Sequence, residues 1–213
     1  MGGHYDQTYF DWHKNISAFG GIANKIKFEA YVRPEDRVLD FGCGGGYLLA
    51  NLNAKEKAGI EVNPAAIEQA KSLGLTMYST TDDVPDEWAD LLISNNALEH
   101  TEYPLTELKR LLPKLKKGGR VVFVVPCENI SYAWYPNDHN QHLHSWGPMS
   151  LGNVFTKAGF EVLESKPFVH KWPPNHVKIM KWFGPRIFHW TCRMYGRWET
   201  TWYQVRLVGK RPA

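Results

Sequence analysis

The sequence predicts an α/β fold in which seven strands form a mostly parallel sheet with helices on both faces. Two observations indicate it. From residue 37 onward, short apolar segments alternate with segments of helical periodicity, which is typical of a parallel sheet covered on both sides. Residues 89–95 are apolar on both faces, as central parallel strands are. The last strand, within residues 200–209, is expected to return antiparallel.

The individual elements follow from the signals at their ends. Strands are expected at residues 37–41, 57–62, 75–79, 89–95, 120–126, 160–169 and 200–209. The helix after the second strand is the best defined, because Asn63 can cap it, Pro64 suits its first position and Gly74 ends it. Other helices are expected at residues 22–32, from residue 47 and at residues 104–115, with a broken amphipathic helix within residues 171–198.

The composition suits one domain spanning residues 1–213. A chain of 213 residues with 43% hydrophobic content can bury a sizeable core, and its formal net charge of +3 is modest. We find no apolar run long enough to cross a bilayer and no charged-then-apolar leader at the start. Three widely spaced cysteines, Cys43, Cys127 and Cys192, do not suggest a disulfide framework and favour the reducing cytoplasm.

A glycine-rich loop after the first strand is the strongest functional signal. Gly42, Gly44 and Gly46 allow a sharp turn and a close approach of the backbone to a nucleotide-like ligand. A dinucleotide site would need glycine at position 47, where the sequence has Tyr47. Asp40 precedes the loop, and a carboxylate there suits a ligand with a positive group better than it suits a pyrophosphate.

This loop, together with an acid at the end of the second strand, resembles the first motifs of the class I S-adenosylmethionine-dependent methyltransferases. The resemblance implies their Rossmann-like fold and S-adenosylmethionine as the cofactor. Glu61, about twenty residues after Asp40, stands where a carboxylate can accept both ribose hydroxyls, and Asp40 is assigned to the amino end of the cofactor. The expected cofactor contacts are Asp40, Gly42, Cys43, Gly44, Gly46, Glu61, Val62 and Asn95.

The adenine partner is less well marked. The family usually places an acid a few residues before a proline between the third and fourth strands. Here threonines stand nearer that point and acids slightly later, so Thr81 or Asp82 is the expected contact.

The fourth strand leads into a Leu-Glu-His run, residues 98–100, which the resembled family carries beside the methyl donor. Residues at this strand end lie at the topological switch point, where ligands bind in such sheets. Asn95 is the better candidate for a cofactor contact. His100 is counted on the acceptor side, although Glu99 and His100 can equally orient the loop and cap the next helix.

The segment before the first strand, residues 1–33, is dense in aromatic residues with polar tips. In the resembled family such segments often cover the cofactor pocket, and Tyr5 and Tyr9 would then contribute to a lid, Tyr9 against the cofactor and Tyr5 against the acceptor. The alternative is that these aromatic residues pack an extra helix onto the sheet. Both interpretations stay open.

Residues 127–146 form a loop too long for an ordinary turn and rich in aromatic and titratable groups. Long loops at the carboxyl edge of a sheet often recognise the substrate. We therefore expect substrate-side contacts from Trp134, Tyr135 and His139.

The histidines of this loop allow three interpretations. His142 and His144 are the candidate catalytic residues, with His142 as the base, because imidazole titrates near neutral pH. The histidines can instead hold the loop through hydrogen bonds. A divalent ion bound by His139, His142 and His144 is the third interpretation, but no cysteine or helical histidine pair at ligand spacing supports it, and we predict a site without metal.

The last part of the chain is basic and aromatic. Residues 166–213 contain ten lysines and arginines against one acid, Glu199, and five of the nine tryptophans. Within it, residues 170–199 form a second substrate-side insertion. Its basic face is simply solvated, or it meets an anionic substrate or an anionic membrane surface; single-stranded nucleic acid is the least favoured partner.

Taken together, these patterns predict an enzyme that transfers a methyl group from S-adenosylmethionine to an oxygen or nitrogen atom of a small polar or anionic metabolite or glycan precursor. A methyltransferase acting on a membrane-associated, lipid-linked substrate is one alternative. The others are a cofactor-binding scaffold without catalysis and a nucleotide-linked oxidoreductase of the same topology. The sequence does not indicate the oligomeric state.

Overall fold

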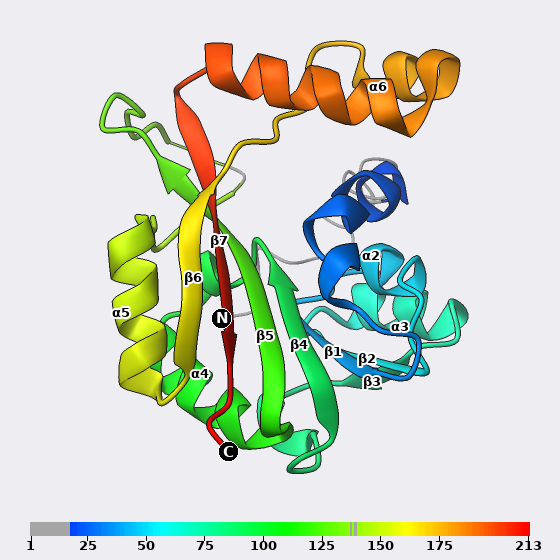
Figure 1. Cartoon of the computed structure of the whole chain (residues 1–213), viewed down its shortest axis with the longest axis vertical. Coiled ribbons are helices and arrows are strands. Elements are labelled where there is room, and N and C mark those ends of the chain that lie inside the picture. Colours follow the sequence, from blue (N-terminus) through cyan, green and yellow to red (C-terminus); the bar gives the residue numbers. More distant parts are fainter. Residues whose placement is uncertain (1–17, 137, 139) are drawn as a thin grey trace.

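A computed structural model describes residues 18–136, 138 and 140–213 of the chain. One seven-stranded sheet runs through it in the order β3-β2-β1-β4-β5-β7-β6 (Figure 1). The strands β1 to β5 pair in parallel, whereas β7 lies antiparallel between β5 and β6. The predicted fold class and the antiparallel last strand are confirmed.

The bounds of the elements agree closely with the sequence pattern. The strands are β1 (Arg37–Phe41), β2 (Glu56–Ile60), β3 (Thr76–Tyr78), β4 (Ala89–Asn95), β5 (Leu115–Glu128), β6 (Glu161–Phe168) and β7 (Trp202–Lys210). The α-helices are α2 (Tyr47–Ala50), α3 (Pro64–Ser72), α4 (Pro104–Leu111), α5 (Pro148–Ala158) and α6 (His176–Trp198). Short 3-10 helices are η1 (Asn24–Lys27), η2 (Glu29–Tyr31), η3 (Thr81–Asp83), η4 (Leu98–His100) and η5 (Leu112–Lys114).

The core has two halves, one on each face of the sheet. Strand β5 divides its side chains between them with period two, so Val121 and Phe123 face one half and Val122 and Val124 the other. Helices α4 and α5 cover the first half, and α2, α3 and Phe28 cover the second. Burial on both faces explains why the central strands are apolar throughout.

The segment before β1 differs from the single helix predicted at residues 22–32. Residues 18–23 are helical, but η1 and η2 follow as separate 3-10 turns. Phe28 lies between them at φ −124°, outside the helical region, and is fully buried. Lys27, beside it, is also buried. The predicted helix is therefore interrupted at Phe28, whose side chain packs into the core.

Strand β5 is longer than the predicted residues 120–126. It pairs with β7 along its length, from Arg120 opposite Lys210 to Glu128 opposite Trp202. This pair extends past the rest of the sheet toward α6 (Figure 1). The loop after β5 and the helix before β7 are therefore carried by one two-stranded extension.

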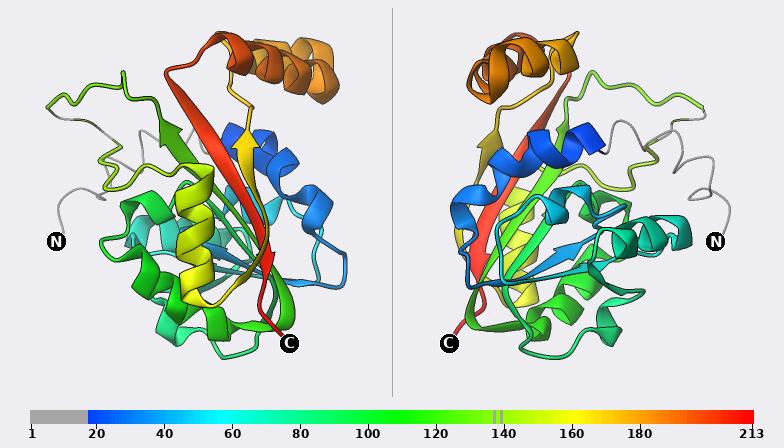
Figure 2. Two further views of the ribbon diagram at one scale, coloured as in Figure 1. Left: turned by 60° about the vertical axis from the view of Figure 1, so that its left-hand side comes forward. Right: turned by 90° about the vertical axis from the view of Figure 1, so that its right-hand side faces the viewer.

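Helix α6 is broken, as predicted. Gly184 has φ 76° and ψ 175°, and Pro185 follows it, so two helical segments meet there at a kink. The second segment packs on the body through Phe188, Cys192 and Gly196. In both views of Figure 2, α6 lies beyond the end of the sheet. Within the described part of the chain, no helix combines the length and apolar character needed to cross a membrane.

Candidate active site

A cavity of about 610 Å³ lies at the carboxyl ends of the central strands. Its walls come from the loop after β1, the residues after β2 and the residues after β4. Six of the predicted cofactor residues line it: Gly42, Cys43, Gly44, Glu61, Val62 and Asn95. This is the switch point of the sheet, where β1 has β2 on one side and β4 on the other.

The three glycines of the loop have different tasks. All three adopt positive φ angles, which glycine alone adopts without strain. A Cβ at Gly42 would lie 2.2 Å from the Cβ of Ala97, and one at Gly46 would lie 2.4 Å from Leu75, so both glycines permit close packing. A Cβ at Gly44 would meet nothing within 4 Å among the described residues. Gly44 thus leaves space on the side of the cavity, where a ligand can approach the backbone.

Glu61 fastens this loop to the segment after β2. One carboxylate oxygen accepts from the Gly44 amide at 2.8 Å, and the other accepts from the amides of Val62 (2.8 Å) and Asn63 (2.9 Å). A carboxylate has about four acceptor sites, so these bonds leave capacity for a hydroxyl donor. Asn63 in turn caps α3 as predicted, accepting from the Ala65 amide at 2.9 Å.

The carboxyl of Asp40 is buried, and this residue directly precedes Phe41 and Gly42, which line the cavity. Burial raises the pKa of this group well above its usual range, and the negative charge of Glu61 raises it further. Its Oδ1 atom has no hydrogen-bond partner among the residues that the structure describes. A cationic ligand group in the cavity would offset both effects. This environment suits a positively charged ligand and disfavours a pyrophosphate.

Asn95 is held by a residue that the sequence did not mark. The Lys27 ammonium donates to Asn95 Oδ1 at 2.8 Å. Burial lowers the pKa of Lys27 to about 7, and the charge of Glu99 opposes this shift. Because the Asn95 oxygen accepts from Lys27, its amide nitrogen is the atom left to donate to a ligand.

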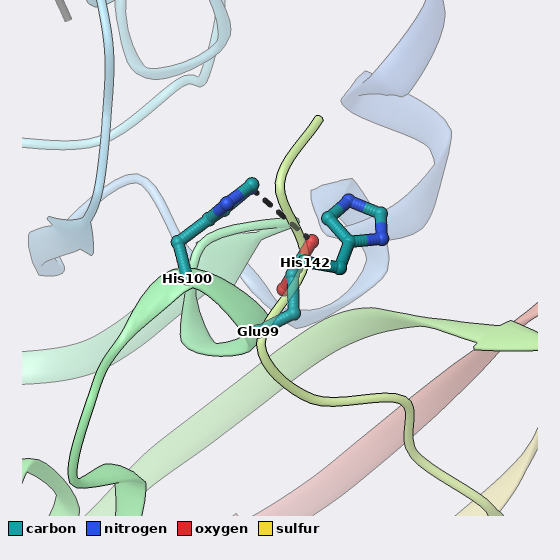
Figure 3. Close-up of side chains that lie close together, drawn as sticks. All are labelled: Glu99, His100 and His142. Carbon is teal, nitrogen blue, oxygen red and sulfur yellow. Dashed lines mark ion pairs between the residues drawn. The ribbon is translucent and has the colours of Figure 1, made fainter. Parts of the chain in front are cut away.

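Three titratable side chains meet next to the cavity (Figure 3). Glu99 is fully buried, and burial raises its pKa to about 8. His100 Nε2 lies 4.0 Å from Glu99 Oε1, and His100 also lines the cavity. The His142 ring lies 5.0 Å from that of His100, and its Nδ1 atom lies 2.6 Å from Glu128 Oε1.

The loop that carries His142 is tied to η4 through its backbone. The amides of Leu143 and His144 both donate to the Glu99 carbonyl, at 2.9 and 3.2 Å. These bonds join two segments more than forty residues apart. His142 is therefore held over the Leu-Glu-His run rather than left at the tip of a long loop.

The other predicted residues lie away from this centre. Thr81 donates to Glu107, and Asp82 pairs with Arg110, so both contact α4 and neither lines the cavity as the described residues form it. Trp134 and Tyr135 are exposed, and His144 lies beside the Trp146 ring at 5.5 Å. The predictions for Tyr5, Tyr9 and His139 concern residues outside the described part of the chain.

The individual residues that the segment before β1 and residue 172 contribute to the cavity wall were not predicted from the sequence. Gly20, Gly21 and Asn24 line the cavity, as does Trp172. A Cβ at Gly21 would lie 2.6 Å from the backbone of Tyr47, so this glycine lets the segment sit directly on the start of α2. The Gly-Gly pair was a readable signal of close approach. The sequence carries no such signal for Trp172, because this residue is far along the chain from the other cavity residues.

A comparison with protein families identifies the chain. Residues 11–165, well over half of the sequence, match the family described as "Methyltransferase domain". The chain belongs to the class I S-adenosylmethionine-dependent methyltransferases. Their cofactor is S-adenosylmethionine, and the buried Asp40 and the open face of Gly44 fit a cationic nucleoside in this chain.

The curated relatives of this chain carry names that differ in the substrate. The chain is 32% identical over 127 residues to malonyl-[acyl-carrier protein] O-methyltransferase of Marinomonas sp., covering 52% of this chain and 47% of that protein. It is 29% identical over 103 residues to ribosomal protein L11 methyltransferase of Ralstonia pickettii, covering 44% and 33%. The chain thus spans a third to about half of the length of these curated relatives.

A solved structure supports the fold over nearly the whole chain. An S-adenosylmethionine-dependent methyltransferase of Thermotoga maritima superposes with a TM-score of 0.66 at 17% identity, covering 95% of this chain and 94% of that one. At this identity the likeness concerns the fold.

Replacing Asp40 by asparagine should separate stability from cofactor binding. The folded pKa of this acid lies above its unfolded value, so the stability that Asp40 contributes is lost as pH rises from the usual aspartate range toward the shifted pKa. Asp40→Asn does not ionise, so the ligand-free variant should melt higher than the wild type at pH 8 and by a smaller margin at pH 5. It should bind S-adenosylhomocysteine, which keeps the cationic amino group, more weakly.

Thermal unfolding at the two pH values and titration calorimetry measure these effects. Asp86→Asn, which changes an exposed acid paired with Lys114, is the matched control and should show neither effect. A pH-independent melting difference at Asp40→Asn would contradict the role of its buried charge.

Proposed function

We propose that the chain transfers the methyl group of S-adenosylmethionine to an oxygen or nitrogen atom of a small polar or anionic metabolite or glycan precursor. One observation carries this proposal: a cluster of titratable side chains opens onto the same cavity as the glycine loop, through His100. The three free cysteines accord with action in the reducing cytoplasm.

The cofactor supplies a sulfonium methyl that is already activated for in-line displacement, so the protein mainly positions the two reactants and excludes water. Glu61 and the open face of Gly44 hold the nucleoside, and Asp40 favours its positive end. A hydroxyl or protonated amine acceptor must also lose a proton. His142 is our candidate base: with Nδ1–H donating to Glu128, its other ring nitrogen carries the lone pair.

Calorimetry with S-adenosylhomocysteine and with NAD tests the cofactor assignment. We expect binding of the first and none of the second, because Tyr47 stands where a dinucleotide loop needs glycine and Asp40 repels a pyrophosphate. Failure to bind S-adenosylhomocysteine would refute the proposal. Binding without methyl transfer to any metabolite extract would instead favour the scaffold.

His142→Ala should slow methyl transfer by about a hundredfold or more, with nearly unchanged affinity for S-adenosylhomocysteine. Glu128→Gln should give a smaller loss, because it removes only the group that fixes the His142 tautomer. Transfer of labelled methyl groups into a metabolite extract measures both. Wild-type turnover in His142→Ala would remove this histidine from the mechanism.

A second candidate function, methylation of a membrane-associated lipid-linked substrate, rests on the surface of α6. The side of α6 opposite its buried residues carries a stripe of large exposed apolar side chains: Ile187, Trp190, Met194 and Trp198. Arg186, Arg193 and Arg197 are exposed along one flank of this stripe. Tryptophan beside basic residues is typical of helices that lie in a membrane interface.

The charge of α6 favours an anionic lipid surface over a second copy of the chain. The helix contains five lysines and arginines and no acid. Two copies packed through this stripe would bring like charges together, whereas anionic headgroups would neutralise them.

Sedimentation with vesicles tests this surface. The full chain should bind vesicles containing phosphatidylglycerol, bind pure phosphatidylcholine weakly, and lose binding at high salt. The double variant Trp190→Ser/Arg197→Ser should bind at least about tenfold more weakly, because the arginine contributes about 1 kcal/mol, roughly fivefold, and loss of the buried tryptophan surface adds to it.

The control Leu163→Ser/Lys157→Ser removes an exposed apolar and a basic side chain from β6 and α5, away from α6. It should bind like the wild type. Equal binding by both double variants, or none by the wild type, would reject the lipid surface.

A further inference from the structure

We propose that Glu99, His100 and His142 bind a divalent first-row transition-metal ion beside the cofactor cavity. One ligand atom from each side chain lies within 4.8 Å of the others (Figure 3). Ligands bound to one ion at about 2.1 Å lie about 3 to 4 Å apart, so a small movement of the side chains would complete the set. This differs from both the metal-free site and the His139, His142 and His144 set considered from the sequence.

The carboxylate of Glu99 provides an independent reason. The side chain is fully buried, and neither of its oxygens is hydrogen-bonded to another residue in the described part of the chain. The buried ammonium of Lys27 donates to Asn95 and not to this carboxylate. Buried carboxylates ordinarily pair with a donor or coordinate a metal, because an unpaired one is costly. The two histidines beside Glu99 are the ligands that would complete such a site.

The surroundings of His142 also match a metal ligand. Metal-binding histidines usually donate their second ring N–H to a carboxylate, which fixes the tautomer and the ring orientation. Glu128 is in that position, 2.6 Å from Nδ1. The backbone bonds from Leu143 and His144 to the Glu99 carbonyl hold the two ligand-bearing segments together. The set is therefore assembled before any ion binds.

The ligand types define the class of ion. Two imidazoles and one carboxylate suit zinc, iron, manganese or cobalt, whereas calcium and magnesium prefer oxygen ligands alone. Three protein ligands leave coordination positions open for substrate or water. His100 lines the cofactor cavity, so these positions lie on the methyl-donor side.

This ion would also define the acceptor, a step that rests on the proposed function. A hydroxyl bound to the ion has a lowered pKa and releases its proton to water. The oxygen then forms a bond to the methyl carbon while the carbon–sulfur bond breaks, and its electron pair stays on sulfur to give S-adenosylhomocysteine. The acceptor class is thus an alcohol, phenol or enol, and His142 acts as a ligand instead of a free base.

Cobalt binding to the full chain tests the site without any acceptor. After treatment with a chelator and its removal, the protein should bind one equivalent of Co²⁺ and show the visible absorption of low-coordinate cobalt. Glu99→Gln keeps the side-chain shape and every histidine, and it should bind Co²⁺ about a hundredfold more weakly. Glu161→Gln is the matched control and should bind like the wild type. It changes a carboxylate of β6 that pairs with Lys210 of β7.

The outcomes separate this inference from the proposed function. No cobalt binding, or equal binding by Glu99→Gln and the wild type, overturns the site even where S-adenosylhomocysteine still binds. Chelation should abolish methyl transfer into a metabolite extract, and Zn²⁺, Mn²⁺, Fe²⁺ or Co²⁺ should restore it. Full activity of the chelated protein overturns the catalytic role of the ion and leaves His142 as the base.

Discussion

The close approach of the loop after β1 to the segment after β4 is the constraint on which the site depends. Gly42 lies so near Ala97 that a Cβ would overlap it at 2.2 Å, and the Gly42 amide donates to the Ile60 carbonyl at 2.9 Å. One backbone thus contacts the ends of both neighbouring strands. The contact helps bring Glu61 and His100 to the lining of one cavity.

Three buried ionisable groups near the cavity lower the stability of the fold. Asp40 and Glu99 carry raised pKa values and Lys27 a lowered one, each mainly through burial. Apolar residues at these positions would avoid the desolvation cost. Several groups with shifted pKa values near the carboxyl ends of the central strands are instead typical of sites that bind or transform a charged ligand.

The sequence predicted what depends on local pattern. The strand at Ala89–Asn95, the Asn63 cap and the glycine loop follow from periodicity and backbone chemistry within a few residues. Local pattern could not predict the burial of Lys27 or the cluster at Glu99. The partner of Lys27 lies 68 residues away, and the partners of Glu99 lie in a distant loop. Lys27 is buried next to Phe28, which packs into the core, and no local pattern in the sequence marks this lysine.

Lys171, at the base of α6, ties the basic insertion to β7 and lies next to a residue that lines the cavity. The Lys171 ammonium donates to the Glu199 carbonyl at 2.6 Å and lies 4.9 Å from the Trp202 ring, so it joins both ends of the insertion to β7. Trp172, the next residue, lines the cavity. The basic insertion and the nucleoside pocket therefore lie next to each other in the structure, although the sequence shows them as separate features.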